Sequence, residues 1–148
     1  KNIDIYNAAQ SIKNFATGIF PSHWLEMAKS RLYDGDSSAA WTLHRIVRDT
    51  LTVFSPVCPF FTHHLSTTLY DLSSTEIDTF PQLSDDFVEE LDVENWLTLS
   101  EPIMEFNSNI WRQKKEAGTS LNSEISNIVI PEEISSLKES FVRMHKLV

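Results

Sequence analysis

Aromatic and basic side chains share one face of a helix that the sequence predicts over residues 37–54. Trp41, Arg45 and Arg48 lie at spacings of i, i+4 and i+7, which places them on one side of a helix with His44 beside them. An indole plane can stack on unpaired bases, and guanidinium groups can pair with phosphates. The spacing therefore predicts contact with a nucleic acid. The structural alternative is that Trp41 packs at the edge of the core and the arginines bond nearby acidic residues.

A second basic and aromatic cluster stands near the end of a long predicted helix. Its members are Trp111, Arg112, Lys114 and Lys115. Cations at the C-terminus of a helix also interact favourably with the helix dipole, so this cluster needs no ligand to explain it. Both interpretations stay open for these residues.

Lys29 and Arg31 form a third, smaller basic group, on the helix predicted from residue 21 to about residue 33. Glu26 precedes Lys29 by three positions, a spacing at which the two side chains can pair on a helix surface. The group is therefore a weaker candidate for an RNA contact than the first two.

The residue patterns of common enzyme sites do not occur in this chain. Its three glycines lie far apart, which excludes a P-loop and a dinucleotide-binding loop. The single cysteine, Cys58, excludes an intrachain disulfide and a CxxC motif. The five histidines form no helical zinc pattern, because the adjacent His63 and His64 point in different directions on a helix. No catalytic residue and no metal site is predicted.

The net charge of −9 is concentrated in one segment. Residues 1–70 carry six Lys or Arg against five Asp or Glu, and residues 106–148 carry the same numbers. Residues 71–105 carry eleven acidic residues and no Lys or Arg. This segment lacks the spacing of a calcium loop and is predicted to be a solvated connector that faces away from a bound RNA.

Apolar residues recur at helical spacing through most of the chain. We expect helices over residues 3–17, 21–33, 37–54, 59–71, 85–117 and 132–147. The expected fold is all-α, an antiparallel helix bundle (residues 1–118) with a small strand-helix appendage (residues 119–148) packed on it. The appendage's strand is predicted at residues 128–130, and a kink or break at about residues 100–102 because of Pro102.

The sequence also bears on location. No stretch approaches the ~20 apolar residues of a membrane span, and the chain begins on Lys1 without a signal-type hydrophobic region. We therefore expect a cytoplasmic protein without membrane contact. The start on lysine suggests a fragment of a longer chain.

Four runs of residues resemble motifs of one family in register. Residues 23–33, HWLEMAKSRLY, resemble the "YxExxKxRLY" helix of the anticodon-binding domain of valyl-tRNA synthetases, and residues 54–62, FSPVCPFFT, resemble its "LxPxxPFxTEE" signature. Residues 75–81 stand in the place of its "SIHxxxWP", and residues 112–122 resemble its "RxxKxxxGxxLN". The order and spacing agree over about residues 10–130.

The resemblance implies a helical domain that docks on the anticodon stem-loop of tRNA. A separate catalytic domain, with HIGH and KMSKS signatures that this chain lacks, would join valine to the tRNA using ATP and magnesium. No catalysis and no cofactor is therefore implied for this chain, and its implied partners are the tRNA and the catalytic domain. The candidate RNA contacts by motif match are Lys29, Arg31, Arg112 and Lys115. Trp41, Arg45 and Arg48 rest on the helix-face argument, and Lys114 on its place in the second cluster.

The chain departs from the family pattern at two places. His63 and His64 replace the acidic pair after "PFxT", and Phe80 replaces the tryptophan before proline. Isoleucyl- and leucyl-type synthetases share much of the pattern, so they remain alternatives. A further alternative is a helical protein-interaction module that uses the acidic segment at residues 71–105.

Overall fold

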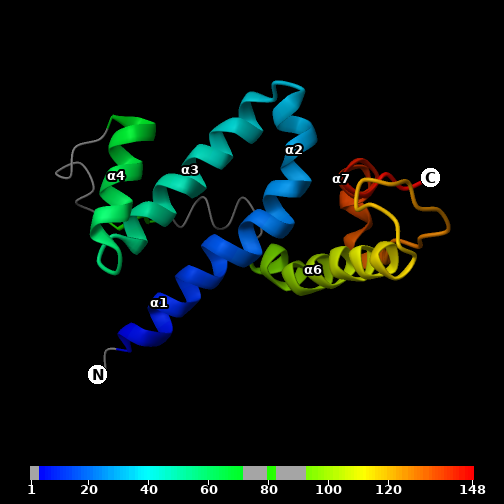
Figure 1. The fold of residues 1–148 in the computed structure, drawn as a ribbon, viewed down its shortest axis with the longest axis horizontal. Helices are drawn as coiled ribbons and strands as arrows, with labels where there is room; N and C mark the ends of the chain where they lie inside the picture. The colour runs from blue at the N-terminus through cyan, green and yellow to red at the C-terminus, as the bar shows by residue number, and fades with distance from the viewer. Residues whose placement is uncertain (1–3, 72–79, 83–92) are drawn as a thin grey trace. The chain divides into compact units, whose positions relative to one another are not determined.

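A computed structural model describes residues 4–71, 80–82 and 93–148 (Figure 1). The chain forms two compact units. One consists of Lys1–Ser22 and Gly35–Leu83, and the other of His23–Asp34 and Ser84–Val148. Most of the acidic residues in the segment at residues 71–105 lie outside the described residues. The predicted boundary at residue 118 stays a prediction.

The first unit begins with α1 (Ile5–Asn14). Asp4 caps this helix, because its carboxylate accepts a hydrogen bond of 3.0 Å from the backbone amide of Asn7. The helix predicted over residues 3–17 ends as an α-helix at Asn14. The chain continues as the π-helix η1 (Phe15–Trp24), through both Gly18 and Pro21.

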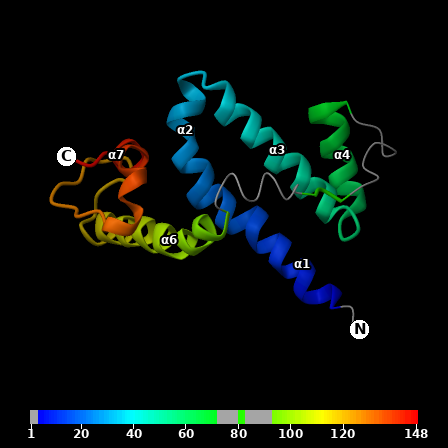
Figure 2. The same cartoon turned by 180° about the vertical axis from the view of Figure 1, so that it is seen from behind.

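Helix α3 (Ser37–Phe54) has the bounds that the sequence predicts. The Asp36 carboxylate accepts hydrogen bonds from the backbone amides of Ser38 (2.9 Å) and Ala39 (3.1 Å), which would otherwise lack partners in the first turn. The helix ends just before Pro56. Within this unit α3 packs against α1 and α4, and it buries Ala39 and Leu51 (Figure 2).

Replacing Asp36 with alanine should lower the free energy of unfolding by about 1 kcal/mol, because two backbone amides lose their acceptor. Urea denaturation followed by helical circular dichroism measures the change. Ser37→Ala is the matched control, since it removes the neighbouring hydroxyl that could have served as the cap. We expect that variant to stay within about 0.5 kcal/mol of the parent protein. Equal effects of the two substitutions would contradict the assignment of Asp36 as the cap.

Helix α4 (Pro59–Tyr70) completes the first unit and confirms the helix predicted over residues 59–71. Proline suits its first position, where an amide donor is not needed. Thr62 and Ser66 are buried, and the Thr62 hydroxyl donates to the Cys58 carbonyl at 3.0 Å. Asp71 ends the helix in the left-handed conformation, with φ at 53°.

The second unit is built around α6 (Val93–Glu116), with α2 (Leu25–Tyr33), the 3₁₀ turn η3 (Glu132–Leu137) and α7 (Lys138–His145). The contacts of α7 with α2 and of η3 with α6 hold it together. Helix α6 is continuous through Pro102, so the predicted break does not occur there, while the alternative of a kink stays a prediction. The buried core comprises Met27, Ile103, Phe106, Ile110, Ile134 and Phe141.

The strand predicted at residues 128–130 was wrong, and the described residues form no strand of any length. Only an isolated bridge between Ile125 and Leu147 occurs in that part of the chain. Ile128 and Ile130 pack against the core, while Val129 between them is 87% exposed. The two isoleucines therefore hold an irregular loop on the core. An alternating run forms a strand only where a second strand pairs with it.

Candidate nucleic-acid interface

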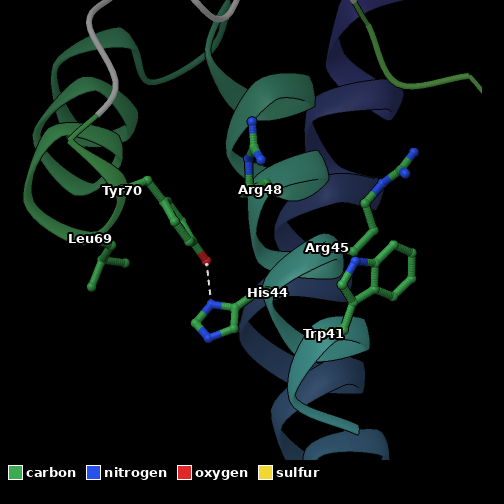
Figure 3. A pocket seen from close by; sticks show the side chains of 6 residues that line it. All are labelled: Trp41, His44, Arg45, Arg48, Leu69 and Tyr70. Carbon is green, nitrogen blue, oxygen red and sulfur yellow. Dashed lines mark hydrogen bonds between the residues drawn. The ribbon is translucent and has the colours of Figure 1, made fainter. Parts of the chain in front are cut away.

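A surface pocket of about 490 Å³ lies between α3 and α4 within the first unit (Figure 3). It contains the three residues that the helix-face argument predicts, together with side chains from the end of α4. The lining residues are Trp41, His44, Arg45, Arg48, Leu69 and Tyr70. The predicted face is therefore one wall of a pocket.

His44 and Tyr70 join the two helices across this pocket. Nδ1 of His44 lies 3.2 Å from the Tyr70 hydroxyl, and the two rings meet edge to face with their centroids 5.8 Å apart. Figure 3 shows the two side chains pointing toward each other, with Trp41 and Arg45 on the other flank of α3. Partial burial raises the pKa of Tyr70, against a smaller opposite effect of Arg48. The phenol therefore stays protonated at neutral pH and remains a hydrogen-bonding group.

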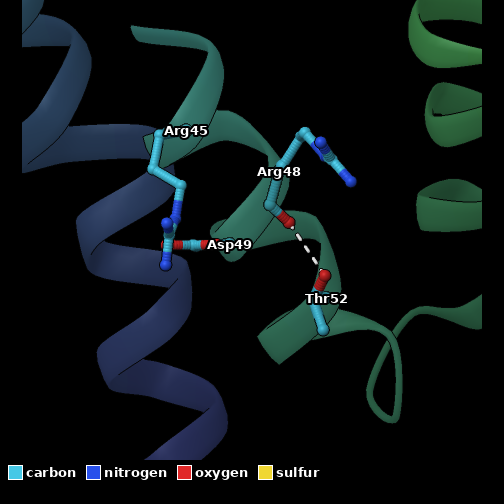
Figure 4. Close-up of polar contacts among 4 residues, drawn as sticks. All are labelled: Arg45, Arg48, Asp49 and Thr52. Atoms are coloured by element: carbon cyan, nitrogen blue, oxygen red, sulfur yellow. Dashed lines mark hydrogen bonds and ion pairs between the residues drawn. The ribbon is translucent and has the colours of Figure 1, made fainter. Parts of the chain in front are cut away.

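The two pocket arginines have different partners. Nε of Arg45 donates to Asp49 at 2.7 Å, in an ion pair at the protein surface. The guanidinium carbon of Arg48 lies 5.9 Å from the centre of the Tyr70 ring, within the range of a cation–π contact. Figure 4 shows Arg48 pointing away from Asp49 and its backbone carbonyl accepting the Thr52 hydroxyl. Arg48 thus brings its positive charge to the pocket.

Trp41 is 62% exposed and Leu69 is 57% exposed. The structural alternative, in which Trp41 packs at the core edge, therefore does not describe this tryptophan. The same alternative also states that the arginines bond nearby acidic residues, and Arg45 does so with Asp49. An exposed indole and an exposed aliphatic side chain beside two arginines provide both stacking surface and positive charge.

The second predicted cluster divides between surface and core. Arg112 and Lys115 are exposed, and Arg112 donates to the Asn109 side-chain oxygen at 2.7 Å. Trp111 is half-buried, with its ring 5.2 Å from His23 and 5.8 Å from His145. Only the two exposed cations of this cluster are available to a ligand.

Lys114 is 1% exposed. Because a buried ammonium cannot reach an RNA, the prediction of an RNA contact at this position was wrong. Its ammonium donates to the carbonyls of Leu121 (2.9 Å) and His145 (2.7 Å). Burial lowers the pKa of Lys114, with a smaller effect of Lys146 in the same direction. Because its side chain is turned inward onto the backbone, Lys114 holds the C-terminal segment against α6.

The third group lies on α2 in the second unit. Lys29 forms the predicted ion pair with Glu26, which raises the pKa of the lysine. Arg31 is exposed on the same helix. The structure thus places Lys29 and Arg31 in one unit and the α3–α4 pocket in the other.

Sequence reasoning missed the two α4 residues of the pocket, Leu69 and Tyr70. Tyr70 is the last residue of α4, whose end lies within one residue of the predicted end. An aromatic residue at a predicted helix end was therefore the signal that could have pointed to Tyr70. Its partner His44 lies 26 residues earlier, and no spacing rule connects the two.

The described residues lack two other features. They contain no group of three or more His, Cys, Asp or Glu side chains that could hold a metal ion. Within the same ranges, no helix is both long enough and apolar enough to cross a membrane.

Comparison with known proteins identifies the family. The family described as "Anticodon-binding domain of tRNA ligase" matches residues 1–130. The chain belongs to this family. The anticodon-binding-domain assignment confirms the resemblance that the four motifs predict.

Valine–tRNA ligases of several organisms are similar to this chain. The chain is 32% identical over 127 residues to that of Saccharolobus solfataricus, covering 85% of this chain and 15% of the relative. It is 26% identical over 149 residues to that of Nanoarchaeum equitans, covering 99% of this chain and 18% of the relative. It is 29% identical over 154 residues to that of Aeropyrum pernix, covering 97% of this chain and 18% of the relative. The anticodon-binding domain described here thus spans less than a fifth of each relative. No solved structure matches the chain.

Proposed function

We propose that this chain binds the anticodon stem-loop of a valine tRNA as one domain of a valine–tRNA ligase. The observation that carries the proposal is the α3–α4 pocket, where an exposed tryptophan and two arginines meet in a member of the anticodon-binding-domain family. The relatives that cover most of the chain are valine–tRNA ligases, which favours valine over the isoleucyl and leucyl alternatives.

The chemistry of the pocket suits a folded RNA loop. Arg48, and Arg45 when it leaves Asp49, can pair with phosphates, while Trp41 offers a plane for a splayed base. Stem bases present few readable edges to side chains, so sequence is read in the loop. Four cations of the second unit are further proposed contacts: the partly buried Lys29 and the exposed Arg31, Arg112 and Lys115.

The ligase reaction itself belongs to the rest of the proposed parent enzyme. ATP and magnesium would bind its catalytic domain, which is also a proposed partner of this chain, and we assign no cofactor to the residues described here. The cytoplasm is the proposed location, since aminoacylation serves translation there.

Binding of an anticodon stem-loop to the 148-residue chain tests the proposal. Affinity should fall steeply as salt rises, because each phosphate contact releases counterions. Arg48→Ala should weaken binding about five- to tenfold and reduce the salt slope by about one. Fluorescence anisotropy across a salt series measures both quantities.

Lys138→Ala is the matched control, because it removes one positive charge from an exposed position on α7. It should change the affinity by less than about twofold, since Lys138 is not one of the residues that line the α3–α4 pocket. Absence of binding at low salt would overturn the proposal. Equal losses for Arg48→Ala and Lys138→Ala would show that overall charge, and not the α3–α4 pocket, carries the binding.

A further inference from the structure

We propose that His23, Asn107 and His145 form a proton-linked relay, in which a proton taken up by His23 weakens the attachment of α7 to α6. The three side chains belong to the second unit and lie on η1, α6 and α7. Asn107 is 0% exposed and His145 is 1% exposed, whereas His23 is only partly buried. His23 is therefore the end of the relay nearest to solvent.

The side-chain amide of Asn107 determines where each histidine carries its proton. Its oxygen Oδ1 lies 2.8 Å from Nε2 of His145 and can only accept, so Nε2 must donate. Its nitrogen Nδ2 lies 3.4 Å from Nδ1 of His23 and can only donate, so that Nδ1 must accept. Both neutral rings therefore carry their single proton on Nε2.

The other ring nitrogen of His145 fixes the direction in which the Asn107 amide points. This Nδ1 is buried and has no hydrogen-bond partner among the described residues. A reversed amide would turn its NH₂ group toward Nε2 of His145 and force the ring proton onto Nδ1. Buried N–H groups without an acceptor are rarer in proteins than acceptors without a donor. The orientation with Oδ1 toward His145 is therefore favoured while both rings are neutral.

A second proton on His23 conflicts with this arrangement. It creates an N–H group at Nδ1, which then faces the NH₂ group of Asn107 as donor against donor. Asn107 can accept from His23 only after its amide reverses. The reversed amide no longer accepts from His145, whose proton would then need the partnerless Nδ1.

The charged His23 ring competes well for the single amide oxygen. A hydrogen bond from an ionised donor is roughly twice as strong as a neutral one, so Oδ1 should turn from His145 to His23. Trp111 keeps the His23 ring beside Asn107, because the indole and imidazole centroids lie 5.2 Å apart. The same indole meets the His145 ring at 5.8 Å. His23 therefore loses aromatic packing if it turns away from the amide.

The bond that His145 loses belongs to the attachment of the C-terminal segment. His145 is the last residue of α7, and its carbonyl accepts from the Lys114 ammonium at 2.7 Å. The backbone amide of Ile125 donates to the Lys146 carbonyl, one residue further, at 3.2 Å. The side-chain bond to Asn107 joins the same turn to α6. Its loss should loosen α7 while the backbone contacts remain.

The charges around the relay separate the two titrations. Burial, and to a smaller extent the charge of Lys114 on α6, lowers the pKa of His145 to about 4. Lys146 of α7 acts in turn on Lys114. Burial alone lowers the pKa of the less buried His23 from its ordinary value of 6.5. His23 should therefore take up its proton at a higher pH than His145.

The test follows both imidazole rings by nitrogen NMR in the 148-residue chain, as the pH is lowered from about 7.5 to about 4.5. Spectra that correlate ring nitrogens with ring protons distinguish a protonated nitrogen from an unprotonated one. At the start we expect both rings to be neutral with the proton on Nε2. As His23 takes up its proton, the nitrogen signals of His145 should shift with the same midpoint.

His23→Phe is the matched variant, because it keeps a ring against Trp111 and removes the titrating nitrogen. In this variant the His145 signals should stay constant until His145 itself titrates at about pH 4. Below the His23 midpoint, amide exchange in α7 should be about threefold slower in the variant than in the parent at the same pH, since one ordinary hydrogen bond is retained. His63→Phe, at an exposed position of α4, should behave like the parent.

Two results in the parent chain alone would overturn the relay. One is a His145 ring whose nitrogen signals do not move while His23 titrates. The other is a neutral His145 that carries its proton on Nδ1 at the start of the titration. Equal exchange of α7 in the parent and in His23→Phe would likewise show that the proton on His23 does not reach the attachment of α7.

Discussion

Replacing Lys114 with methionine should lower the free energy of unfolding by about 3 kcal/mol, because two carbonyl groups lose a charged donor. The ammonium now bonds the Leu121 and His145 carbonyls at 2.9 and 2.7 Å, and the side chain is 1% exposed. Methionine has a similar length and no donor, so water has little room to replace the ammonium. Burial lowers the pKa of Lys114, so the cost of burying this charge offsets part of what the bonds contribute.

Urea denaturation at pH 7 measures this effect, and amide hydrogen exchange locates it. The neighbouring Lys115→Met is the control, because Lys115 is exposed and should cost less than about 0.5 kcal/mol. Exchange should quicken in residues 119–148 of the Lys114 variant, since the lysine joins that segment to α6. If Lys114→Met were as stable as Lys115→Met, this would contradict the role of Lys114 in holding the C-terminal segment against α6.

Acidification should destabilise the second unit through His145. Burial, with a smaller effect of the charge on Lys114, lowers the pKa of His145 to about 4. The side chain is 1% exposed, its Nε2 donates to Asn107 Oδ1 at 2.8 Å, and its Nδ1 has no hydrogen-bond partner among the described residues. A second proton would therefore be placed on a buried nitrogen without an acceptor.

The sign follows from the two pKa values. Well above pH 6.5 histidine is neutral in both the folded and the unfolded state, so His145 adds no pH dependence to the stability. Between pH 6.5 and about 4, His145 binds a proton in the unfolded chain but stays neutral in the folded chain. The free energy of unfolding therefore falls as the pH falls. The total loss should approach about 3 kcal/mol, and below about pH 4 this contribution becomes constant.

Denaturation curves between pH 7 and pH 3.5 test this dependence by comparison of variants. His145→Gln should lose the His145 share of the acid-side slope, whereas the exposed His63→Gln should keep it. A smaller slope of the same sign should remain from His23, whose pKa is also lowered by burial. An unchanged slope in His145→Gln would contradict a neutral buried His145.

Local signals in the sequence predicted those parts of the fold that local chemistry decides. Helix α3 has the predicted bounds because Asp36 caps its start and Pro56 follows its end. Gly118 follows the end of α6, with φ at 67°. Gly18 is not a signal of this kind, because the chain continues there as a π-helix. A glycine permits a helix end, but it does not require one.

Tertiary contacts decided the rest. The apolar run at residues 128–130 has strand character, yet the described residues offer no partner strand, so it forms a loop on the core. Lys114 looks like its neighbour Lys115 in sequence, and its partners are backbone carbonyls 7 and 31 residues away. Trp41, Arg45 and Arg48 were predicted together because helical spacing alone joins them. Their pocket needs Tyr70, which only the packing of α4 on α3 brings near.

The central claim is that the α3–α4 pocket is where this chain meets the anticodon loop. Chemical-shift mapping by NMR tests it most directly, with a stem-loop that carries a valine anticodon titrated into the labelled chain. We predict that the Trp41 indole N–H, the Arg48 guanidinium and the Tyr70 ring shift together and saturate with one RNA per chain. Saturable shifts confined to α6 and α7, with the signals of these three side chains unmoved, would contradict the account.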